Sequence, residues 1–245
     1  GDPQSAKVVA DHLKLPLKFV KVTKDDIKRA LPVVIEALAT YNSQLILGGL
    51  ATYFISRAAA KDGLKVMLFG EGADEIFGGY RRYKESSSPE DLHSMMIEDQ
   101  NSLWLSHNKR VDHASMAASI EVRVPFQDLN VIGNSREIPI DKKVDLSNEL
   151  VDKICLRQIA LKYLPKKIAG REKITISSGS GLSALVAEVL KETKYDPLSK
   201  ADVVAFNLRN QPEMLFLSMW KKYYPNLSDN YFDLVNRNLF SSSFN

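Results

Sequence analysis

The sequence has only one cysteine, Cys155, among its 245 residues. A single cysteine cannot form a disulfide within the chain, which fits the reducing conditions of the cytoplasm. Cys155 shares a helical pattern with Val151, Ile154 and Ile159, so we interpret it as a small core residue and not as a nucleophile. We therefore expect a cytoplasmic protein.

An excess of one charge and long apolar runs are also missing. The 33 basic and 30 acidic residues nearly balance, and no Lys/Arg block is long enough to predict a nucleic-acid-binding arm. No apolar run approaches the roughly 18 residues that a membrane span requires, and the N-terminal sequence has no signal-peptide pattern. It also lacks an initiator methionine, so we expect a processed chain or a piece of a longer one. Neither nucleic acid nor a membrane is expected as a partner.

Three common functional patterns are absent. The four histidines, at positions 12, 93, 107 and 113, do not have metal-ligand spacing. No Gly-x-Ser-x-Gly elbow supports serine hydrolysis. The serine- and glycine-rich run at 177–181 has no lysine where a Walker-type phosphate loop requires one. The chemistry must therefore come from other motifs.

Hydrophobic residues make up 44% of the sequence, which is enough for a sizeable core, and no internal repeat is present. Helical and strand-like patterns alternate over the first 80 residues, and the rest is mostly helical. This order predicts an α/β fold in one domain, with a parallel sheet covered by helices on both faces and a mostly helical C-terminal part. The expected helices cover residues 2–13, 23–39, 43–60, 90–107, 111–119, 148–163, 182–193, 213–223 and 230–239, and the expected strands cover residues 17–22 and 64–69.

Local signals refine two of these helices. Thr23 and Asp26 have the spacing of a capping box, which opens the second helix. Pro32 lies inside that helix and should kink or split it. Gly48 and Gly49 should allow the third helix to pack closely against a neighbour.

The stretch "KVMLFGEGADEIFGGY", residues 65–80, combines a buried strand pattern with a glycine-rich turn. A strand that ends at Phe69 brings Gly70, Glu71 and Gly72 to its carboxyl end, where ligands bind in open α/β sheets. Both glycines allow a sharp turn and a close approach of the backbone to a ligand. The pattern suits a ligand site, although a purely structural turn is the alternative.

Three acidic residues follow the strand in different settings. Asp74 and Glu75 are expected in the first turn of a short helix that ends at Gly78 and Gly79, where acidic groups interact favourably with the helix dipole. Glu71 precedes that helix, so the dipole does not explain it. A carboxylate at this place can act as a base or hold a divalent cation.

A second segment, residues 112–128, is helical at first and extended up to the proline before its end. Asp112 and Asp128 flank Glu121 and Arg123. Arg123 can be a structural partner of Glu121 or Asp128, or it can bind a carboxylate or phosphate through two hydrogen bonds.

A third segment, residues 170–181, places Lys173 between Gly170, Arg171 and a serine- and glycine-rich run. Such a loop can close over a phosphorylated ligand, with the lysine as a point charge. The alternative is a flexible surface loop, and we expect residues 166–181 to be mobile.

Together and in this order, the three segments resemble the synthetase domain of the asparagine synthetase family, which has an ATP-pyrophosphatase-type, adenine nucleotide alpha hydrolase-like fold. The family motif S-G-E-G-S-D-E-x-F-G-G-Y is similar to residues 69–80, and D-R-M-S-M-A-x-x-x-E-x-R-x-P-F-x-D is similar to residues 112–128. The family's R-x-K loop is similar to residues 171–173, and its closing Leu/Trp-rich helix is similar to residues 213–224. The resemblance extends over nearly the whole chain.

The resemblance implies a reaction and roles for the motif residues. ATP adenylates the β-carboxylate of aspartate, and ammonia then attacks the β-aspartyl-adenylate to give asparagine, AMP and pyrophosphate. Glu71 resembles the catalytic glutamate that handles protons, and Lys173 resembles the lysine that stabilises phosphate charge. Asp74 is similar to the carboxylate that binds Mg²⁺, and Gly70 and Gly72 are expected beside the ATP. The substrate side is expected to contain Arg110, Asp112, Glu121 and Arg123.

Departures from the family pattern leave alternatives open. The pyrophosphate loop S-G-G-x-D-S, which the family places upstream of where this chain begins, is absent from this sequence, as is the glutaminase domain. The domain is therefore expected to be N-terminally incomplete, with ammonia supplied directly or by a glutaminase domain or partner. Phe69 and Ala73 stand where the family has small hydroxyl residues. Alternatives are a non-catalytic scaffold or regulatory remnant, and a β-lactam-synthetase-like enzyme that closes an intramolecular amide; those relatives usually have tyrosine where Glu71 stands.

Overall fold

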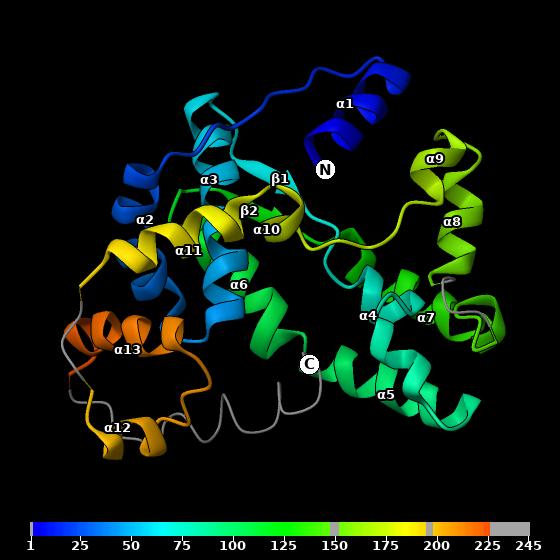
Figure 1. Ribbon diagram of the computed structural model, residues 1–245. Coiled ribbons are helices and arrows are strands. Elements are labelled where there is room, and N and C mark those ends of the chain that lie inside the picture. The colour runs from blue at the N-terminus through cyan, green and yellow to red at the C-terminus, as the bar shows by residue number, and fades with distance from the viewer. Residues whose placement is uncertain (1, 148–151, 195–197, 226–245) are drawn as a thin grey trace. The chain divides into compact units, whose positions relative to one another are not determined.

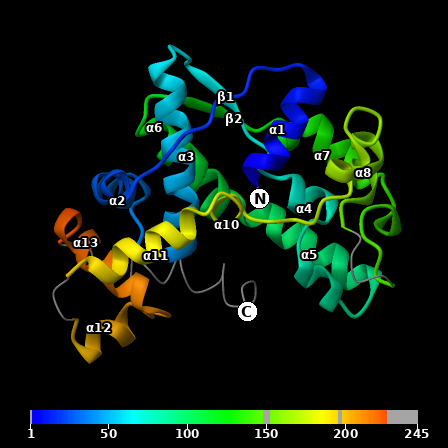
Figure 2. The same ribbon diagram turned by 45° about the horizontal axis from the view of Figure 1, so that its top comes forward.

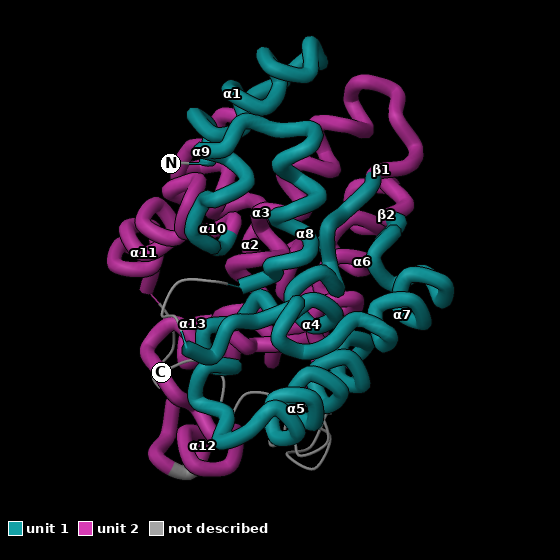
Figure 3. Tube along the Cα trace, turned by 90° about the vertical axis from the view of Figure 1, so that its right-hand side faces the viewer, with its two compact units in different colours: residues 1–19, 68–104, 123–175 teal, residues 20–67, 105–122, 176–245 magenta. Residues whose placement is uncertain are grey.

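The computed structural model describes residues 2–147, 152–194 and 198–225 (Figure 1). Within it the chain forms two compact units (Figure 3). That all of the chain acts as one domain stays a prediction. Unit 1 contains residues 1–19, 68–104 and 123–175, and unit 2 contains residues 20–67, 105–122 and 176–245.

The core of unit 2 is built around α2, which begins at the predicted capping box. Thr23 Oγ1 accepts the N–H of Asp26 at 3.2 Å, and the Asp26 carboxylate accepts the N–H of Thr23 at 2.9 Å. The helix continues across Pro32 to Leu38, so the proline does not split it. The apolar face of α2 is buried against α3, α11 and α13. The α-helices of unit 2 are α2 (Lys24–Leu38), α3 (Ser43–Lys61), α6 (Lys109–Met116), α10 (Ile176–Gly179), α11 (Leu182–Glu192), α12 (Lys200–Ala205) and α13 (Gln211–Tyr223).

Two glycines bring α3 close to its neighbours in unit 2, α2 and α6 (Figure 2). A Cβ at Gly49 would lie 2.7 Å from Cδ1 of Leu38 in α2. A Cβ at Gly48 would lie 2.7 Å from Cδ of Arg110 in α6. Such distances leave no room for a side chain in a densely packed interior. The close packing predicted for this glycine pair is therefore confirmed.

Unit 1 consists of shorter helices around a small apolar cluster. Ser88 caps α5 by accepting the N–H of Asp91 at 3.1 Å. The buried side chains of Tyr83, Met96 and Val144 belong to the cluster. The α-helices of unit 1 are α1 (Asp2–Leu13), α4 (Ala73–Phe77), α5 (Pro89–Ser102), α7 (Leu129–Arg136), α8 (Ile154–Ala160) and α9 (Lys166–Ala169), with 3₁₀ turns at Arg81–Glu85, Pro125–Gln127 and Ile140–Lys142.

The described residues contain one two-stranded sheet, formed by β1 (Val66–Leu68) and β2 (Glu121–Arg123). The Glu121 N–H donates to the Lys65 carbonyl at 2.8 Å, and the Phe69 N–H donates to the Arg123 carbonyl at 2.9 Å. The residue numbers of the paired positions increase together along the two strands, so the strands are parallel, as predicted. The sheet is much smaller than expected. The expectation that β1 is buried is wrong, because the Leu68 side chain is 71% exposed.

The strand expected over residues 17–22 is not formed. The segment has no secondary structure, and its apolar side chains, such as Leu17 and Phe19, are exposed. A strand requires a neighbour that satisfies its backbone groups, and no described strand pairs with this segment. The alternating pattern alone therefore predicted the wrong element.

Most of the expected helices are confirmed, among them those over residues 2–13, 43–60 and 182–193. The expected helix over 230–239 lies outside the described residues, as do residues 148–151 at the start of another. In the described part of the chain, no helix by itself has the length and hydropathy to cross a membrane. Helices α2 and α3 have the required length and hydropathy only when they are taken together, and this pair is bent by 113°.

Cys155 lies in α8 and is half-buried. Burial raises the pKa of its thiol, although the nearby Lys143 ammonium opposes the shift. A thiol that stays protonated is a poor nucleophile. The prediction of a core position is wrong, because α8 has no buried residue and Ile159 is 50% exposed; the other expected partner, Val151, lies outside the described residues.

Candidate functional site

The glycine-rich turn of unit 1 follows β1 directly and leads into α4. Gly72 has a φ of +97°, and a Cβ there would lie 2.7 Å from Cγ of Gln127. Gly78 ends α4 with a φ of +77°, as the sequence predicts. These conformations favour glycine, because L side chains rarely adopt them. Gly70 is different: it is exposed, and a Cβ there would contact nothing within 4 Å.

Asp74 folds back over the glycine pair that ends α4. The N–H groups of Gly78 and Gly79 donate to the Asp74 carbonyl at 2.9 and 2.8 Å. A Cβ at Gly79 would lie 1.8 Å from Oδ1 of Asp74, which is far inside van der Waals contact. Glycine at position 79 therefore makes room for the Asp74 carboxylate.

Two lysines from distant parts of unit 1 bind the Asp74 carboxylate. Lys153 Nζ lies 2.9 Å from Oδ1, and Lys173 Nζ lies 2.9 Å from Oδ2. All three side chains are partly accessible, with 22–26% of their surface exposed. Burial pushes the pKa of Asp74 upward, but the charges and hydrogen bonds of the lysines prevail and lower it. The site thus contains one ionised carboxylate between two ammonium groups.

The sequence did not predict Lys153 as part of this site. The residue precedes α8 and has left-handed backbone angles, with φ 47° and ψ 41°. This conformation costs a non-glycine residue about 1–2 kcal/mol. The Lys153 N–H donates to the Gly78 carbonyl at 3.3 Å, which brings the lysine to the end of α4. No local pattern marks such a lysine, because its role depends on a contact across 79 positions of sequence.

The segment before Lys173 is held in place by α8. The Arg157 guanidinium donates to the carbonyls of Ala169 and Arg171 at 2.9 and 2.7 Å. The Arg171 guanidinium in turn forms an ion pair with Asp2 at the start of α1. The loop expected to be mobile also contains the short helices α9 and α10, so only part of it lacks regular structure. These contacts give Lys173 a defined position beside Asp74.

Tyr80 and Glu75 form a second, more buried layer next to the lysine. Glu75 is 2% exposed and accepts a hydrogen bond from the Tyr80 hydroxyl. Burial raises the pKa of Glu75 to about 7, against the hydrogen bond from Tyr80, and the charges of Asp74 and Glu71 add to the increase. Lys173 Nζ lies 4.4 Å from the centre of the Tyr80 ring. The helix dipole, which was the predicted reason for Glu75, does not explain its burial.

The other predicted residues of unit 1 lie close to the turn in sequence or through the sheet. Glu71 is half-buried between the two glycines of the turn. Arg123 is exposed, and its carbonyl accepts the N–H of Phe69, the residue before the turn. Asp128, one proposed partner of Arg123, caps α7 by accepting the N–H of Asn130 at 2.8 Å. The structure therefore brings Asp74 and Lys173 together and places the Arg123 backbone beside the start of the turn.

Three predicted substrate-side residues belong to unit 2. Arg110 is half-buried in α6 and lies against Gly48 of α3. Asp112 is exposed on the same helix, and Glu121 is exposed in β2. That these three residues share one site with Asp74 stays a prediction.

The donors present limit what kind of metal site this can be. Within residues 2–147, 152–194 and 198–225, no group of three or more His, Cys, Asp or Glu side chains is placed to hold a metal ion. Asp74 offers a single carboxylate, and each of its oxygens faces a lysine. Mg²⁺ commonly uses one or two carboxylates together with substrate phosphates. The residues fit Mg²⁺ only as an ion carried by a phosphorylated substrate.

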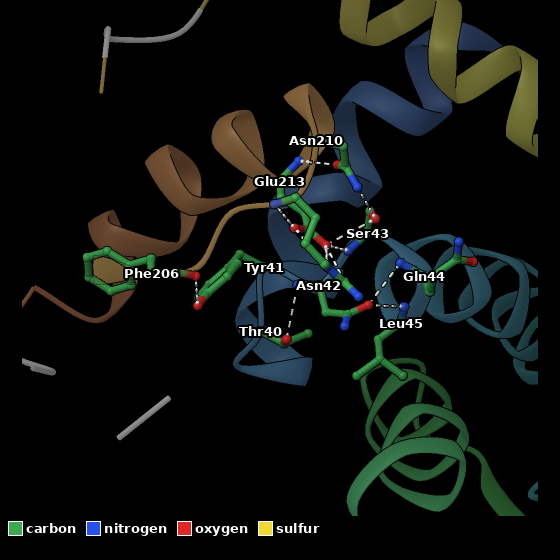
Figure 4. A network of polar contacts seen from close by, with 10 residues as sticks. Thr40, Tyr41, Asn42, Ser43, Gln44, Leu45, Phe206, Asn210 and Glu213 are labelled. Carbon is green, nitrogen blue, oxygen red and sulfur yellow. Dashed lines mark hydrogen bonds and ion pairs between the residues drawn. The ribbon is translucent and has the colours of Figure 1, made fainter. Parts of the chain in front are cut away.

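Unit 2 has a polar cluster of its own, centred on Glu213 of α13 (Figure 4). Glu213 is 1% exposed and accepts the N–H groups of Arg209 at 2.9 Å and Ser43 at 3.3 Å. The Arg209 guanidinium also pairs with it. Asn42 caps α3 by accepting the N–H groups of the second and third residues of the helix at 3.0 and 3.1 Å. These contacts join the starts of α13 and α3, which is a structural role.

The sequence comparisons agree with the arrangement of the motifs. The family model described as asparagine synthase matches residues 2–91 and 84–224. The chain is 31% identical to a putative glutamine-hydrolysing asparagine synthetase of Methanocaldococcus jannaschii over 76% of its length. It is also 31% identical to asparagine synthetase B (glutamine-hydrolysing) of Escherichia coli over 81% of its length, and 34% identical to a probable glutamine-hydrolysing asparagine synthetase of Schizosaccharomyces pombe over 79%.

The matches cover only part of those relatives. They correspond to 40%, 35% and 36% of the length of the three proteins. The family model, by contrast, covers nearly all of the described residues. The chain therefore belongs to the asparagine synthase family.

Proposed function

We propose that the chain contributes to ATP-dependent amide formation, in which aspartate, ATP and ammonia give asparagine, AMP and pyrophosphate through a β-aspartyl-adenylate. The main support is the pair of lysines, Lys153 and Lys173, around the Asp74 carboxylate. Family membership supports the same reaction class, since the matched relatives bear the name asparagine synthetase. The ammonia would come from solution or from a glutaminase domain or partner.

The two lysines suit the adenylation step. Attack of a carboxylate on the α-phosphate builds up negative charge on phosphate oxygens and on the leaving pyrophosphate. Partly exposed ammonium groups that are already held in place can offset this charge with little rearrangement. Lys173 would stabilise the transferring phosphates, and Lys153 would add a second positive charge that the sequence did not predict. Gly70 and Gly72 would allow the nucleotide to approach the backbone.

Glu71 is proposed to act in the second step. Ammonia that adds to the acyl-adenylate must lose a proton, and a carboxylate at the turn can accept it. The residue is half-buried and lies three positions before Asp74. Such a position is close enough along the chain for the two carboxylates to serve one substrate.

Asp74 is the proposed carboxylate for Mg²⁺. An ion carried on the ATP phosphates would neutralise part of their charge there. Substrate contacts from Arg110, Asp112, Glu121 and Arg123 are proposed from the motif alone. The described partners of the Asp74 carboxylate are Lys153 and Lys173.

The first experiment replaces Lys173 by methionine in the intact full-length protein. Loss of one positioned charge should lower the rate of pyrophosphate formation about 100- to 1000-fold, which is about 3–4 kcal/mol of transition-state stabilisation. The matched control is Lys167→Met, at an exposed lysine of α9 in the same unit. Equal rates in the two variants would contradict the role of Lys173.

A second experiment tests the carboxylate at the turn. Glu71→Gln should abolish asparagine formation and spare pyrophosphate release, because only the amide step needs its base. Both products are measured in one reaction with aspartate, ATP and ammonium. Asparagine formation at the parental rate would contradict this role. Absence of ATP binding to the unsubstituted protein in calorimetry would favour the non-catalytic scaffold.

A further inference from the structure

Lys173 has two different partners in unit 1, and one of them is an aromatic ring. Its ammonium contacts the Asp74 carboxylate at 2.9 Å and lies 4.4 Å from the centre of the Tyr80 ring. A lysine side chain is flexible, and one partly exposed ion pair fixes its position only weakly. A cation over an aromatic face gains a second attraction from the ring quadrupole. The ring and the carboxylate together define where the ammonium lies.

The Tyr80 ring is itself held from several directions. Its hydroxyl donates to Glu75, which is 2% exposed. The Arg82 guanidinium lies 5.4 Å from the centre of the ring, and the Tyr83 ring lies edge-on at 5.5 Å. Arg82 is in turn paired with Asp99. The surface on which Lys173 rests therefore has a fixed orientation.

The ring attracts the ammonium without neutralising it. Burial raises the pKa of the Tyr80 hydroxyl, and the negative charges of Glu75 and Asp74 add to the increase, so the group stays a neutral phenol. A neutral ring leaves the charge of the ammonium available to an approaching anion, and the carboxylate that Lys173 contacts, Asp74, is shared with Lys153. Lys153 provides a comparison, since the described contacts of its ammonium are with Asp74 and include no ring.

We propose that Tyr80 is a positioning residue: its ring holds the Lys173 ammonium in place for a phosphate group. The inference rests on the proposed function for the role of that phosphate, but the contact itself can be measured separately. It assigns to the last residue of the glycine-rich motif a role that neither its sequence position nor its hydroxyl suggests.

The test uses the intact full-length protein and three substitutions at position 80. Tyr80→Leu removes the ring, Tyr80→Phe keeps the ring without its hydroxyl, and fluorinated phenylalanine keeps the shape but weakens the attraction of the ring face. Three quantities are measured: the ring-current shift of the Lys173 side-chain protons by NMR, and kcat and KM for pyrophosphate formation. Denaturant unfolding of each variant shows whether it is folded.

The positioning role predicts a specific set of results. Tyr80→Leu should abolish the ring-current shift and lower kcat about tenfold, a change typical of a lost cation–π contact, while KM for aspartate stays within about twofold. Tyr80→Phe should restore the shift and most of kcat, and fluorination should lower kcat again in a protein of unchanged stability. If Tyr80→Leu does not fold, the comparison of Tyr80→Phe with the fluorinated phenylalanine variant tests the positioning role.

Other results would overturn the inference. No ring-current shift in the unsubstituted protein would show that the contact does not exist in solution. A shift with the same kcat in the fluorinated and unfluorinated variants would show that the ring does not position the lysine. If the unsubstituted protein forms no pyrophosphate at all, the proposed function fails. The affinity of the protein for added pyrophosphate is then measured in place of kcat. If fluorination of the ring leaves that affinity unchanged, the positioning role is overturned.

Discussion

Two carboxylates, Asp74 in unit 1 and Glu213 in unit 2, are paired with cations in different ways. Glu213 is 1% exposed and accepts hydrogen bonds from two backbone N–H groups and a serine hydroxyl, besides its arginine. The Asp74 side chain is 24% exposed, and the described partners of its carboxylate are lysine side chains, Lys153 and Lys173. The first is enclosed by fixed groups of its own unit, and the second is bound by flexible ones.

The difference separates a structural pair from a candidate active site. Backbone donors cannot leave Glu213 without opening the starts of two helices, so this carboxylate serves the fold. Lysine side chains can exchange Asp74 for another anion with little change of the backbone, because their stems are flexible. Partly exposed cations beside a glycine-rich turn are what an incoming phosphate requires.

The largest expected effect is on the structural side of this comparison. Glu213→Ala should destabilise the protein by about 3–5 kcal/mol, because it leaves Arg209 without its carboxylate and the Ser43 N–H without an acceptor. The measurement is the free energy of unfolding in urea. The control is Glu192→Gln, at an exposed glutamate paired with Lys24 and Lys28, which should cause no measurable change. Similar losses in the two variants would remove the distinction between enclosed and exposed pairs.

The next effect is a pH dependence from Glu75. Its pKa in the folded protein, about 7, lies above the ordinary value of 4.5, so the folded state binds the proton more tightly than the unfolded state. The contribution of Glu75 to stability is therefore complete below pH 4.5 and is lost as the pH rises to about 7, a change of about 3 kcal/mol. The measurement is the difference in unfolding free energy between the unsubstituted protein and Glu75→Gln as a function of pH. A flat difference between pH 4 and 8 would contradict the raised pKa.

A smaller effect is expected at the glycine that makes room for Asp74. Gly79→Ala places a methyl group against the carboxylate and should cost about 1–3 kcal/mol, as overpacking does. It should also displace Asp74 from both lysines and lower activity. Gly133→Ala, in α7 of the same unit, is the matched control, since its Cβ would meet nothing within 4 Å. If both substitutions were neutral, the close approach at Gly79 would not exist in solution.

The smallest effect concerns the left-handed backbone of Lys153. Replacement by alanine and by glycine removes the same ion pair with Asp74, but only glycine adopts this conformation without strain. We expect Lys153→Gly to be more stable than Lys153→Ala by about 1 kcal/mol. Thermal unfolding of the two variants makes the comparison, and a more stable alanine variant would argue against the left-handed conformation.

Much of the local structure of this chain was predictable. The capping box at Thr23, the glycine end of α4 and the Ser88 cap of α5 each depend on groups within a few positions of one another. The strand over 17–22 was predicted wrongly, because a strand depends on a neighbour that the sequence pattern does not name. The short length and exposure of β1 were missed for the same reason.

The sequence by itself determined which residue types follow β1: glycines where the chain must turn, one acidic residue within the turn and two after it. Local spacing was sufficient for this, since caps and turns use neighbouring groups. Only the tertiary structure decided that Lys153 and Lys173 share Asp74, that Glu75 is buried beneath Tyr80, and that the Tyr80 ring lies beside a lysine. The contacts of the two lysines join parts of the chain that are distant in sequence, so they follow from how unit 1 packs and not from any pattern along the chain.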